Sequence, residues 1–146
     1  MGQLSGMKPE PVGWSAFKTI LVVEDDEDTR EMLALCVESE TSCRVMALPG
    51  VEEVLQSLQE IREAKPRLFI FDLHLVTRTG IELYDALHAL KEFEHVPAII
   101  VTATTLDLEL ERAIAQRKLT LVLKPFDISD FIERVEQVLI GPGQLI

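Results

Sequence analysis

Residues 68–72, Leu-Phe-Ile-Phe-Asp, form an apolar run that ends in a carboxylate. Short, near-continuous apolar runs of this kind are typical of strands that are buried on both faces of a parallel sheet. Three further runs also end in polar groups: Ile20–Val23 before Glu24-Asp25-Asp26, Ala98–Val101 before Thr102-Ala103, and Leu121–Leu123 before Lys124-Pro125. The carboxyl ends of parallel strands share one sheet edge, where ligands bind, so we expect these groups to converge there. Acids, a hydroxyl and an ammonium at one edge favour phosphoryl chemistry on Asp72.

The size and charge of the chain exclude several classes of protein. Its 146 residues, 47% of them hydrophobic, suffice for one domain with a single packed core. The formal net charge of −11 argues against direct nucleic-acid binding. The sequence shows no secretory signal and no stretch long enough to cross a membrane. We therefore interpret Cys36 and Cys43 as reduced thiols of a cytoplasmic protein.

Residues 18–140 alternate short apolar runs with segments of helical period, which predicts an α/β domain of successive strand and helix units. Strands are predicted near residues 18–23, 43–47, 67–71, 97–101 and 119–123. Helices are predicted near residues 28–38, 51–61, 81–90, 106–115 and 128–139. In the first helix we expect Met32, Leu35 and Cys36 to face inward, and we expect Asp127 to cap the last helix.

The two ends of the chain have a different composition. Residues 1–17 mix Gly, Pro and Ser without periodicity and are predicted to form a flexible tail. Residues 141–146 begin with Gly-Pro-Gly and are predicted to be a second tail or the start of a linker.

The segments at the predicted strand ends, taken together, resemble the receiver domain of two-component response regulators, of the CheY-like superfamily. The resemblance extends over about residues 18–140 and keeps the family's order and spacing. It rests on Ile20-Leu21-Val22-Val23-Glu24-Asp25-Asp26, Phe71-Asp72-Leu73, Val101-Thr102-Ala103 and Lys124-Pro125-Phe126. It implies a flavodoxin-like (βα)5 fold, a three-layer sandwich with helices on both faces of a five-stranded parallel sheet of order 2-1-3-4-5.

The same resemblance implies roles for the site residues. Asp72 would accept a phosphoryl group from a histidine of a sensor kinase or phosphotransfer protein, with Thr102 and Lys124 assisting. The domain would promote its own phosphorylation and dephosphorylation and is not expected to be an enzyme acting on other substrates. An output partner would bind the face of the fourth helix, fifth strand and fifth helix. Homodimerisation through this face is left open.

The clustered carboxylates indicate a metal. Carboxylates about 5 Å apart repel each other by roughly 3 kcal/mol per pair at an effective dielectric constant near 20. Magnesium suits such a site best, because it takes oxygen ligands octahedrally and leaves positions for water and a phosphoryl oxygen. By the resemblance, Asp25 and Asp72 are direct ligands, Glu24 acts mostly through water, and the backbone carbonyl of His74 completes the set. The side chains of His74 and Thr104 are expected to overhang the site and to influence the lifetime of the phosphoryl group.

Three positions depart from the family pattern. Leu121 stands where the family usually has an aromatic switch residue, Val76 where it has proline, and Arg117-Lys118 where it has Gly-Ala. An aliphatic side chain at residue 121 cannot swing inward and outward as the aromatic residue does. The sequence therefore leaves a second interpretation open, a degenerate receiver that binds partners without phosphorylation.

Two other classes fit the pattern less well. A phosphatase of the haloacid dehalogenase type also uses a strand-end aspartate and magnesium, but it needs a second acid where His74 stands. A flavodoxin-like cofactor site needs a hydroxyl-rich phosphate loop, whereas Glu24-Asp25-Asp26 would repel an anion. The cognate kinase, the output pathway, and whether the chain is a single-domain regulator or part of a longer protein stay open.

Overall fold

The computed structural model describes residues 18–141, so the predicted tail 1–17 and residues 142–146 of the second predicted tail lie outside the described residues. The described strands are β2 (Thr19–Val23), β3 (Arg44–Leu48), β4 (Leu68–Asp72), β5 (Ala98–Thr102) and β6 (Thr120–Leu123). They pair in parallel in the order β3-β2-β4-β5-β6. Counted along the described chain, this is the order 2-1-3-4-5, so the predicted flavodoxin-like topology is confirmed.

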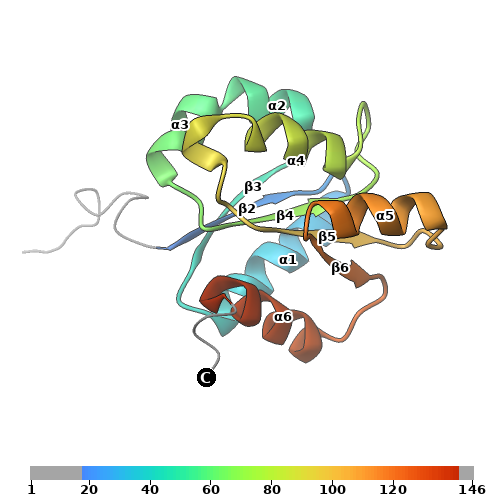
Figure 1. Cartoon of the computed structure of the whole chain (residues 1–146). Helices are drawn as coiled ribbons and strands as arrows, with labels where there is room; N and C mark the ends of the chain where they lie inside the picture. The colour runs from blue at the N-terminus through green and yellow to red at the C-terminus, as the bar shows by residue number, and fades with distance from the viewer. Residues whose placement is uncertain (1–17, 142–146) are drawn as a thin grey trace, which may run out of the picture.

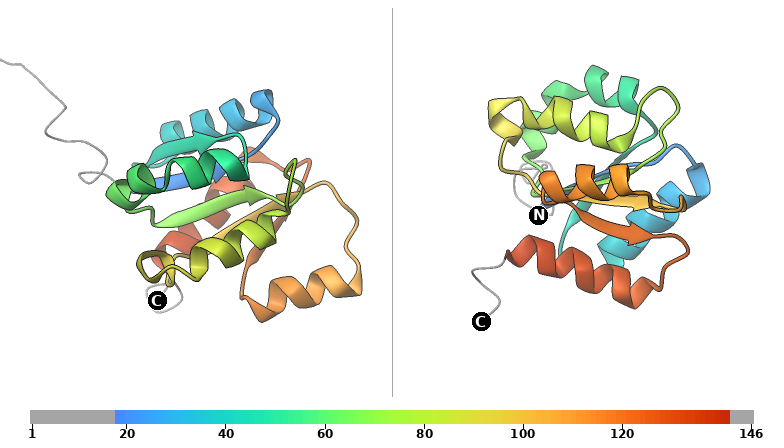
Figure 2. Two further views of the ribbon diagram at one scale, coloured as in Figure 1. Left: turned by 90° about the horizontal axis from the view of Figure 1, so that it is seen from above. Right: turned by 45° about the vertical axis from the view of Figure 1, so that its right-hand side comes forward.

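Helices cover both faces of the sheet and give the three layers seen in Figure 1 and Figure 2. One face is covered by α1 (Glu27–Glu40) and α6 (Ile128–Ile140). The other face is covered by α2 (Val51–Gln56), α3 (Leu58–Ala64), α4 (Gly80–His88) and α5 (Leu108–Gln116). A short 3-10 helix, η1 (Lys91–Phe93), follows α4. None of the helices between residues 18 and 141 is long and apolar enough to span a membrane.

The central strand β4 divides the core into two parts. Because successive side chains of a strand point to opposite faces, Phe69 and Phe71 pack under α2–α5, whereas Leu68 and Ile70 pack under α1 and α6. The rings of Phe69 and Phe71 stack with their centroids 5.1 Å apart. All five residues of β4 are buried, which holds the strand end at Asp72 in a rigid setting.

The predicted single helix over residues 51–61 is wrong, because the chain breaks it into α2 and α3 at Ser57. The Ser57 N–H donates to the carbonyls of both Glu53, at 3.0 Å, and Val54, at 3.1 Å. The second bond has the three-residue spacing of a tightened turn, which ends the regular α-helical ladder. The described residues therefore contain six α-helices, where five were predicted.

The predicted inward face of α1 is also wrong. The buried residues of α1 are Leu33 and Val37, which lie four residues apart and therefore on one face of the helix. Met32 is 36% exposed and Leu35 is 69% exposed. Apolar residues are spread around this part of the helix, so the sequence pattern did not single out the stripe that packs on the sheet.

Helix α5 begins two residues later than predicted. Asp107 is its N-cap residue and accepts a hydrogen bond from the N–H of Leu110, so the helix starts at Leu108 and not at residue 106.

Candidate functional site

The structure brings the three predicted acids together at the carboxyl edge of the sheet. Glu24 and Asp25 directly follow β2, and Asp72 is the last residue of β4. One carboxylate oxygen of each lies within 4.8 Å of the other two. Glu24 is almost fully buried, Asp72 is 9% exposed, and Asp25 is exposed. The cluster therefore opens to solvent on the side of Asp25.

Lys124 joins this cluster from the end of β6. Its Nζ donates to Oε1 of Glu24 at 3.0 Å and to Oδ2 of Asp72 at 3.3 Å. Its backbone N–H donates to the carbonyl of Thr102 at 2.8 Å, which extends the β5–β6 ladder to the site. The lysine therefore connects the ends of β2, β4 and β6 with one positive charge, as predicted.

The titration of the site reflects its burial and its excess of negative charge. Burial, together with the neighbouring Asp72, raises the pKa of Glu24 to about 7, although the Lys124 ammonium acts in the opposite direction. Burial by itself would lower the pKa of Lys124, but its hydrogen bond to Glu24 and its attraction to Asp72 outweigh this effect and raise it. One ammonium thus keeps its charge but does not fully compensate the carboxylates.

Asp72 is oriented by bonds to both of its carboxylate oxygens. Oδ1 accepts a hydrogen bond from the N–H of His74 at 3.1 Å, and Oδ2 accepts the bond from Lys124. The His74 ring contacts the hydroxyl of Thr104 through Nε2. The two side chains therefore contact each other, and their expected influence on the lifetime of the phosphoryl group stays a prediction. That the carbonyl of His74 is a metal ligand stays a prediction.

Thr102 ends β5, next to the end of β4. The two strand ends are joined by the bond from the Leu73 N–H to the carbonyl of Val101, at 2.9 Å. The side chain of Thr102 is fully buried, and its hydroxyl accepts a hydrogen bond from the N–H of Thr104 at 3.0 Å. Ala103 is exposed and leaves the approach to the edge unobstructed by a larger side chain.

Two neighbours of the acids have structural roles. Asp26 caps α1, because it accepts bonds from the N–H of Thr29 at 2.8 Å and from its hydroxyl at 2.7 Å. This agrees with the interpretation of Asp26 as a solvated residue outside the set of metal ligands.

Arg30 was missed by the sequence analysis. Its Nη1 donates to the backbone carbonyl of Glu24 at 3.0 Å, and the available signal was a basic residue one turn after the acids.

The donor set fits a hard divalent cation. Carboxylate oxygens on three converging residues are the ligands that Mg²⁺ and Ca²⁺ prefer, and no soft sulfur or imidazole ligand joins this cluster among the described residues. Burial, and after it the neighbouring Asp72, disfavours the charged form of Glu24 and raises its pKa; a bound cation would favour the charged form.

Comparison with known proteins agrees with this geometry. The family model of the response regulator receiver domain matches residues 20–136. An uncharacterized 14.6 kDa protein from the sodA1 3′ region of Leptolyngbya boryana is 33% identical over 118 residues, covering 81% of this chain and 87% of that protein. The polar-differentiation response regulator DivK of Brucella ovis is 27% identical over 122 residues, covering 84% of this chain and 96% of DivK. The sensory transduction protein LytT of Enterococcus faecalis is 26% identical over 127 residues. The matched region is 87% of this chain but only 50% of LytT.

Solved structures show the same fold. A CheY-like receiver domain protein from Methanospirillum hungatei superposes with a TM-score of 0.73 at 25% identity, covering 84% of this chain and 94% of that one. A response regulator from Chloroflexus aurantiacus superposes with a TM-score of 0.72 at 26% identity, covering 85% and 98% of the two chains. The family model matches most of the chain, and the strand order and the cluster of acids at the sheet edge agree with it. The chain therefore belongs to the response regulator receiver domains, the signalling domains of two-component systems.

Proposed function

We propose that this receiver domain is active and that Asp72 is its phosphoacceptor. The observation that carries the proposal is the setting of Asp72, whose two oxygens are held by Lys124 and by the His74 N–H while two further acids lie within 4.8 Å. A partner histidine kinase or phosphotransfer protein supplies the phosphoryl group as a phosphohistidine. An Asp72 oxygen attacks phosphorus, the phosphorus–nitrogen bond breaks, and the imidazole leaves and takes up a proton.

Each side chain of the site has a part in this transfer. Glu24, Asp25, Asp72 and the carbonyl of His74 would hold Mg²⁺, which when bound neutralises negative charge on the transferring phosphoryl group. Lys124 supplies a fixed positive charge at the same place, and it is already positioned by its bonds to Glu24 and Asp72. The Thr102 hydroxyl accepts a hydrogen bond from the Thr104 N–H, and its own O–H can be donated to a phosphoryl oxygen. The exposed side of the cluster, at Asp25 and Ala103, is where the donor approaches.

We further propose that phosphorylation changes the surface formed by α5, β6 and α6, to which an output partner binds. Thr102 is the last residue of β5 and Lys124 directly follows β6, so any movement of these residues toward a phosphoryl group acts on the strands next to this surface. Free Cys36 and Cys43 support a cytoplasmic setting for this signalling.

The test is intact mass after incubation with acetyl phosphate and MgCl₂. We expect one added phosphoryl group on the wild type, none on Asp72→Asn, and none with excess chelator. Asp25→Asn and Asp26→Asn form a matched pair of neighbours. The first changes a proposed metal ligand and should strongly reduce the addition. The second removes a neighbouring charge outside the acid cluster, at a cap position that Asn can also fill, and should retain the addition. A folded wild type that stays unmodified would favour the degenerate receiver that binds partners without phosphorylation.

A further inference from the structure

The free edge of the sheet carries a groove that the phosphoryl site does not use. Strand β6 is the last strand of the sheet, and two adjoining hollows of about 260 and 680 Å³ run along it and share Arg134 of α6. We call this surface the β6 groove and define it by residues Lys118, Thr120–Leu123, Phe126, Asp130, Phe131 and Arg134. Its floor is mainly apolar, and Leu123 is 49% exposed in it. A contiguous apolar patch of this kind, rimmed by polar residues, is typical of a protein–protein contact surface.

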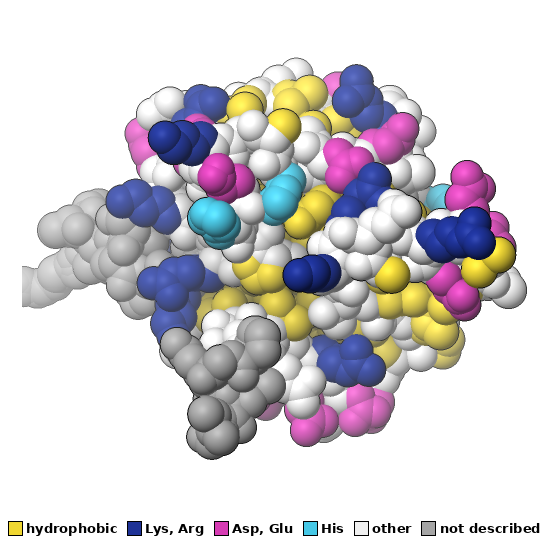
Figure 3. Space-filling model, in the orientation of Figure 1, with side chains coloured by type: hydrophobic (Ala, Val, Ile, Leu, Met, Phe, Trp, Pro, Cys, Tyr) yellow, Lys and Arg dark blue, Asp and Glu magenta, His cyan; other side chains and the backbone are white. Residues whose placement is uncertain are grey.

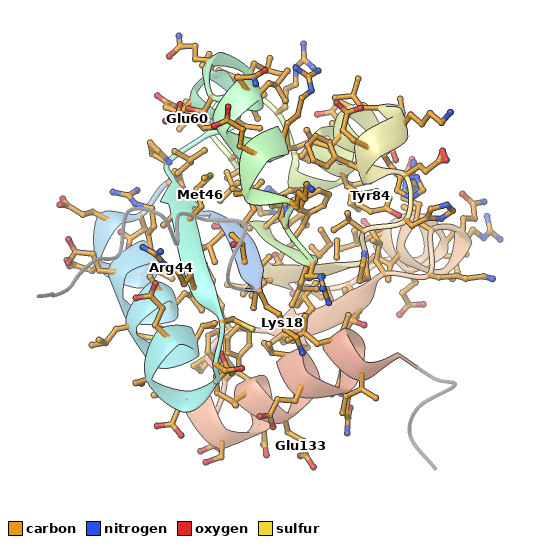
Figure 4. All side chains as sticks on the ribbon, turned by 90° about the vertical axis from the view of Figure 1, so that its left-hand side faces the viewer. Lys18, Arg44, Met46, Glu60, Tyr84 and Glu133 are labelled. Atoms are coloured by element: carbon orange, nitrogen blue, oxygen red, sulfur yellow. The ribbon has the colours of Figure 1, made fainter. Side chains whose placement is uncertain are left out.

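The backbone of β6 is open to pairing. Lys124 N–H donates to the Thr102 carbonyl on β5, so by the two-residue period of a strand the N–H groups of Leu121 and Leu123 face away from β5. Edge strands are usually protected by charged residues or proline, yet the sequence Thr-Leu-Val-Leu of β6 contains neither. The opposite edge differs, because β3 begins with the charged Arg44 (Figure 4). The β6 edge is therefore suited to accept an added strand.

The charges of the groove are opposite to those of the rest of the protein. Lys118 and Arg134 line it, and neither forms an ion pair with a residue between 18 and 141. The acid of the groove is Asp130, at its Phe126 end. The whole chain has a net charge of −11, so this excess of positive charge is local. Figure 3 shows hydrophobic and Lys or Arg side chains side by side on this face, between α5 and α6.

We propose that the β6 groove binds an extended, acidic segment of a partner protein, which adds to β6 as a further strand. Main-chain bonds to Leu121 and Leu123 would hold the segment, its apolar side chains would cover the floor, and its acids would pair with Lys118 and Arg134. A second copy of the chain fits the groove less well, because symmetric pairing of two β6 edges brings the same basic residues together between two acidic molecules. This inference rests on the proposed function, since it gives the chemistry of the output partner on that surface.

The experiment uses a short fluorescein-labelled peptide in which Val alternates with Glu, and a companion peptide in which Val alternates with Lys. We expect anisotropy to report binding of the acidic peptide, with affinity that falls as salt is raised. Arg134→Glu should weaken this binding about fivefold or more, because it removes one exposed ion pair with the peptide and replaces it by repulsion between two acids. Leu123→Lys places a charge on the edge and should abolish it. Lys91→Glu, a charge reversal at an exposed site on η1, should leave it unchanged.

Hydrogen exchange gives the second readout. Bound acidic peptide should slow exchange of the Leu121 and Leu123 amides, and the phosphorylation of Arg134→Glu by acetyl phosphate should stay at the wild-type level. Equal binding of the two peptides, or unchanged affinity in Arg134→Glu, would overturn the inference. Sedimentation showing a dimer of the free domain that Leu123→Lys dissociates would also overturn it, in favour of a second copy. A domain that gains phosphate on Asp72 but binds no peptide would refute the groove while leaving the proposed function intact.

Discussion

Replacing Gly80 by alanine tests how tightly the loop after β4 is built. Gly80 is the first residue of α4, and its N–H donates to the carbonyl of Leu73 at 2.8 Å. A Cβ at this position would lie 2.3 Å from the backbone carbonyl oxygen of Asp72 and 3.1 Å from the Cβ of Phe71. The oxygen belongs to the main chain of a buried strand and cannot rotate away, so α4 or the end of β4 has to move.

The size of the effect follows from the displacement. Ordinary van der Waals contact begins at 3.4 Å, so the two atoms must separate by about 1.1 Å. Overpacking of this kind costs about 1–3 kcal/mol. We expect the upper part of this range, because main-chain hydrogen bonds hold the segment on both sides of the contact: the Gly80 N–H donates to the Leu73 carbonyl and the Leu73 N–H to the Val101 carbonyl. The better helix propensity of alanine returns less than about 1 kcal/mol. The net loss of about 2 kcal/mol corresponds to a fall in Tm of roughly 8 °C for a domain of this size.

The assay is thermal and urea unfolding of the wild type and the variant, followed by the acetyl phosphate mass assay well below both melting temperatures. Because the displaced group is the carbonyl of the phosphoacceptor itself, Gly80→Ala should also slow phosphorylation of Asp72. Gly50→Ala is the matched control: its Cβ would meet only the flexible Oε1 of Glu53, at 3.1 Å, so it should lose only the preference for glycine over alanine at the N-cap of α2, about 1 kcal/mol or less. A Gly80→Ala protein as stable as Gly50→Ala would refute the reasoning.

Three further predictions concern charge and capping. In the absence of divalent cations, the free energy of unfolding should fall as pH rises from 4.5 through about 7. In this pH range Glu24 keeps its proton in the folded protein and loses it in the unfolded protein, so Glu24→Gln should remove the pH dependence. A double-mutant cycle on Arg117, whose guanidinium makes two bonds of 2.8 and 2.9 Å to Asp85 between α5 and α4, should give a coupling energy of about 0.5–1 kcal/mol in urea unfolding, because both side chains are partly exposed. Asp127 caps α6 by accepting a hydrogen bond of 3.2 Å from the Asp130 N–H, so Asp127→Ala should lower the free energy of unfolding of the whole domain by about 1 kcal/mol. Asp107→Ala removes the cap of α5 and should mainly speed amide exchange within that helix.

Each of these predictions has an outcome that contradicts it. A pH slope that persists in Glu24→Gln would assign the titration to another group. A coupling energy near zero would show that the Arg117 pair contributes no stability. Equal global losses for the two cap variants would mean that α5 unfolds together with the rest of the domain, although Ile114 is its only side chain counted as buried.

The sequence was enough to predict a parallel α/β sheet and the convergence of polar residues at one of its edges. Apolar runs that end in Glu24-Asp25, Asp72, Thr102 and Lys124 identify buried parallel strands, and the carboxyl ends of such strands meet at one edge. These residues therefore had to converge whatever the details of packing, and the distances between Glu24, Asp72 and Lys124 agree with this. The roles proposed for these residues in phosphoryl transfer stay predictions.

Only the tertiary structure decided which side chains meet at finer scale. The burial of Leu33 in place of Met32, the break at Ser57, the bond from Arg30 to the Glu24 carbonyl, and the pairing of Arg117 with Asp85 all depend on how each helix is rotated and placed on the sheet. The spacing of apolar residues predicts that a helix has an apolar side. The rotation of the helix about its own axis, however, is set by packing against residues that are far away in the sequence. The β6 groove arises in the same way, because it forms where α6 lies beside a strand that has no further neighbour among residues 18–141.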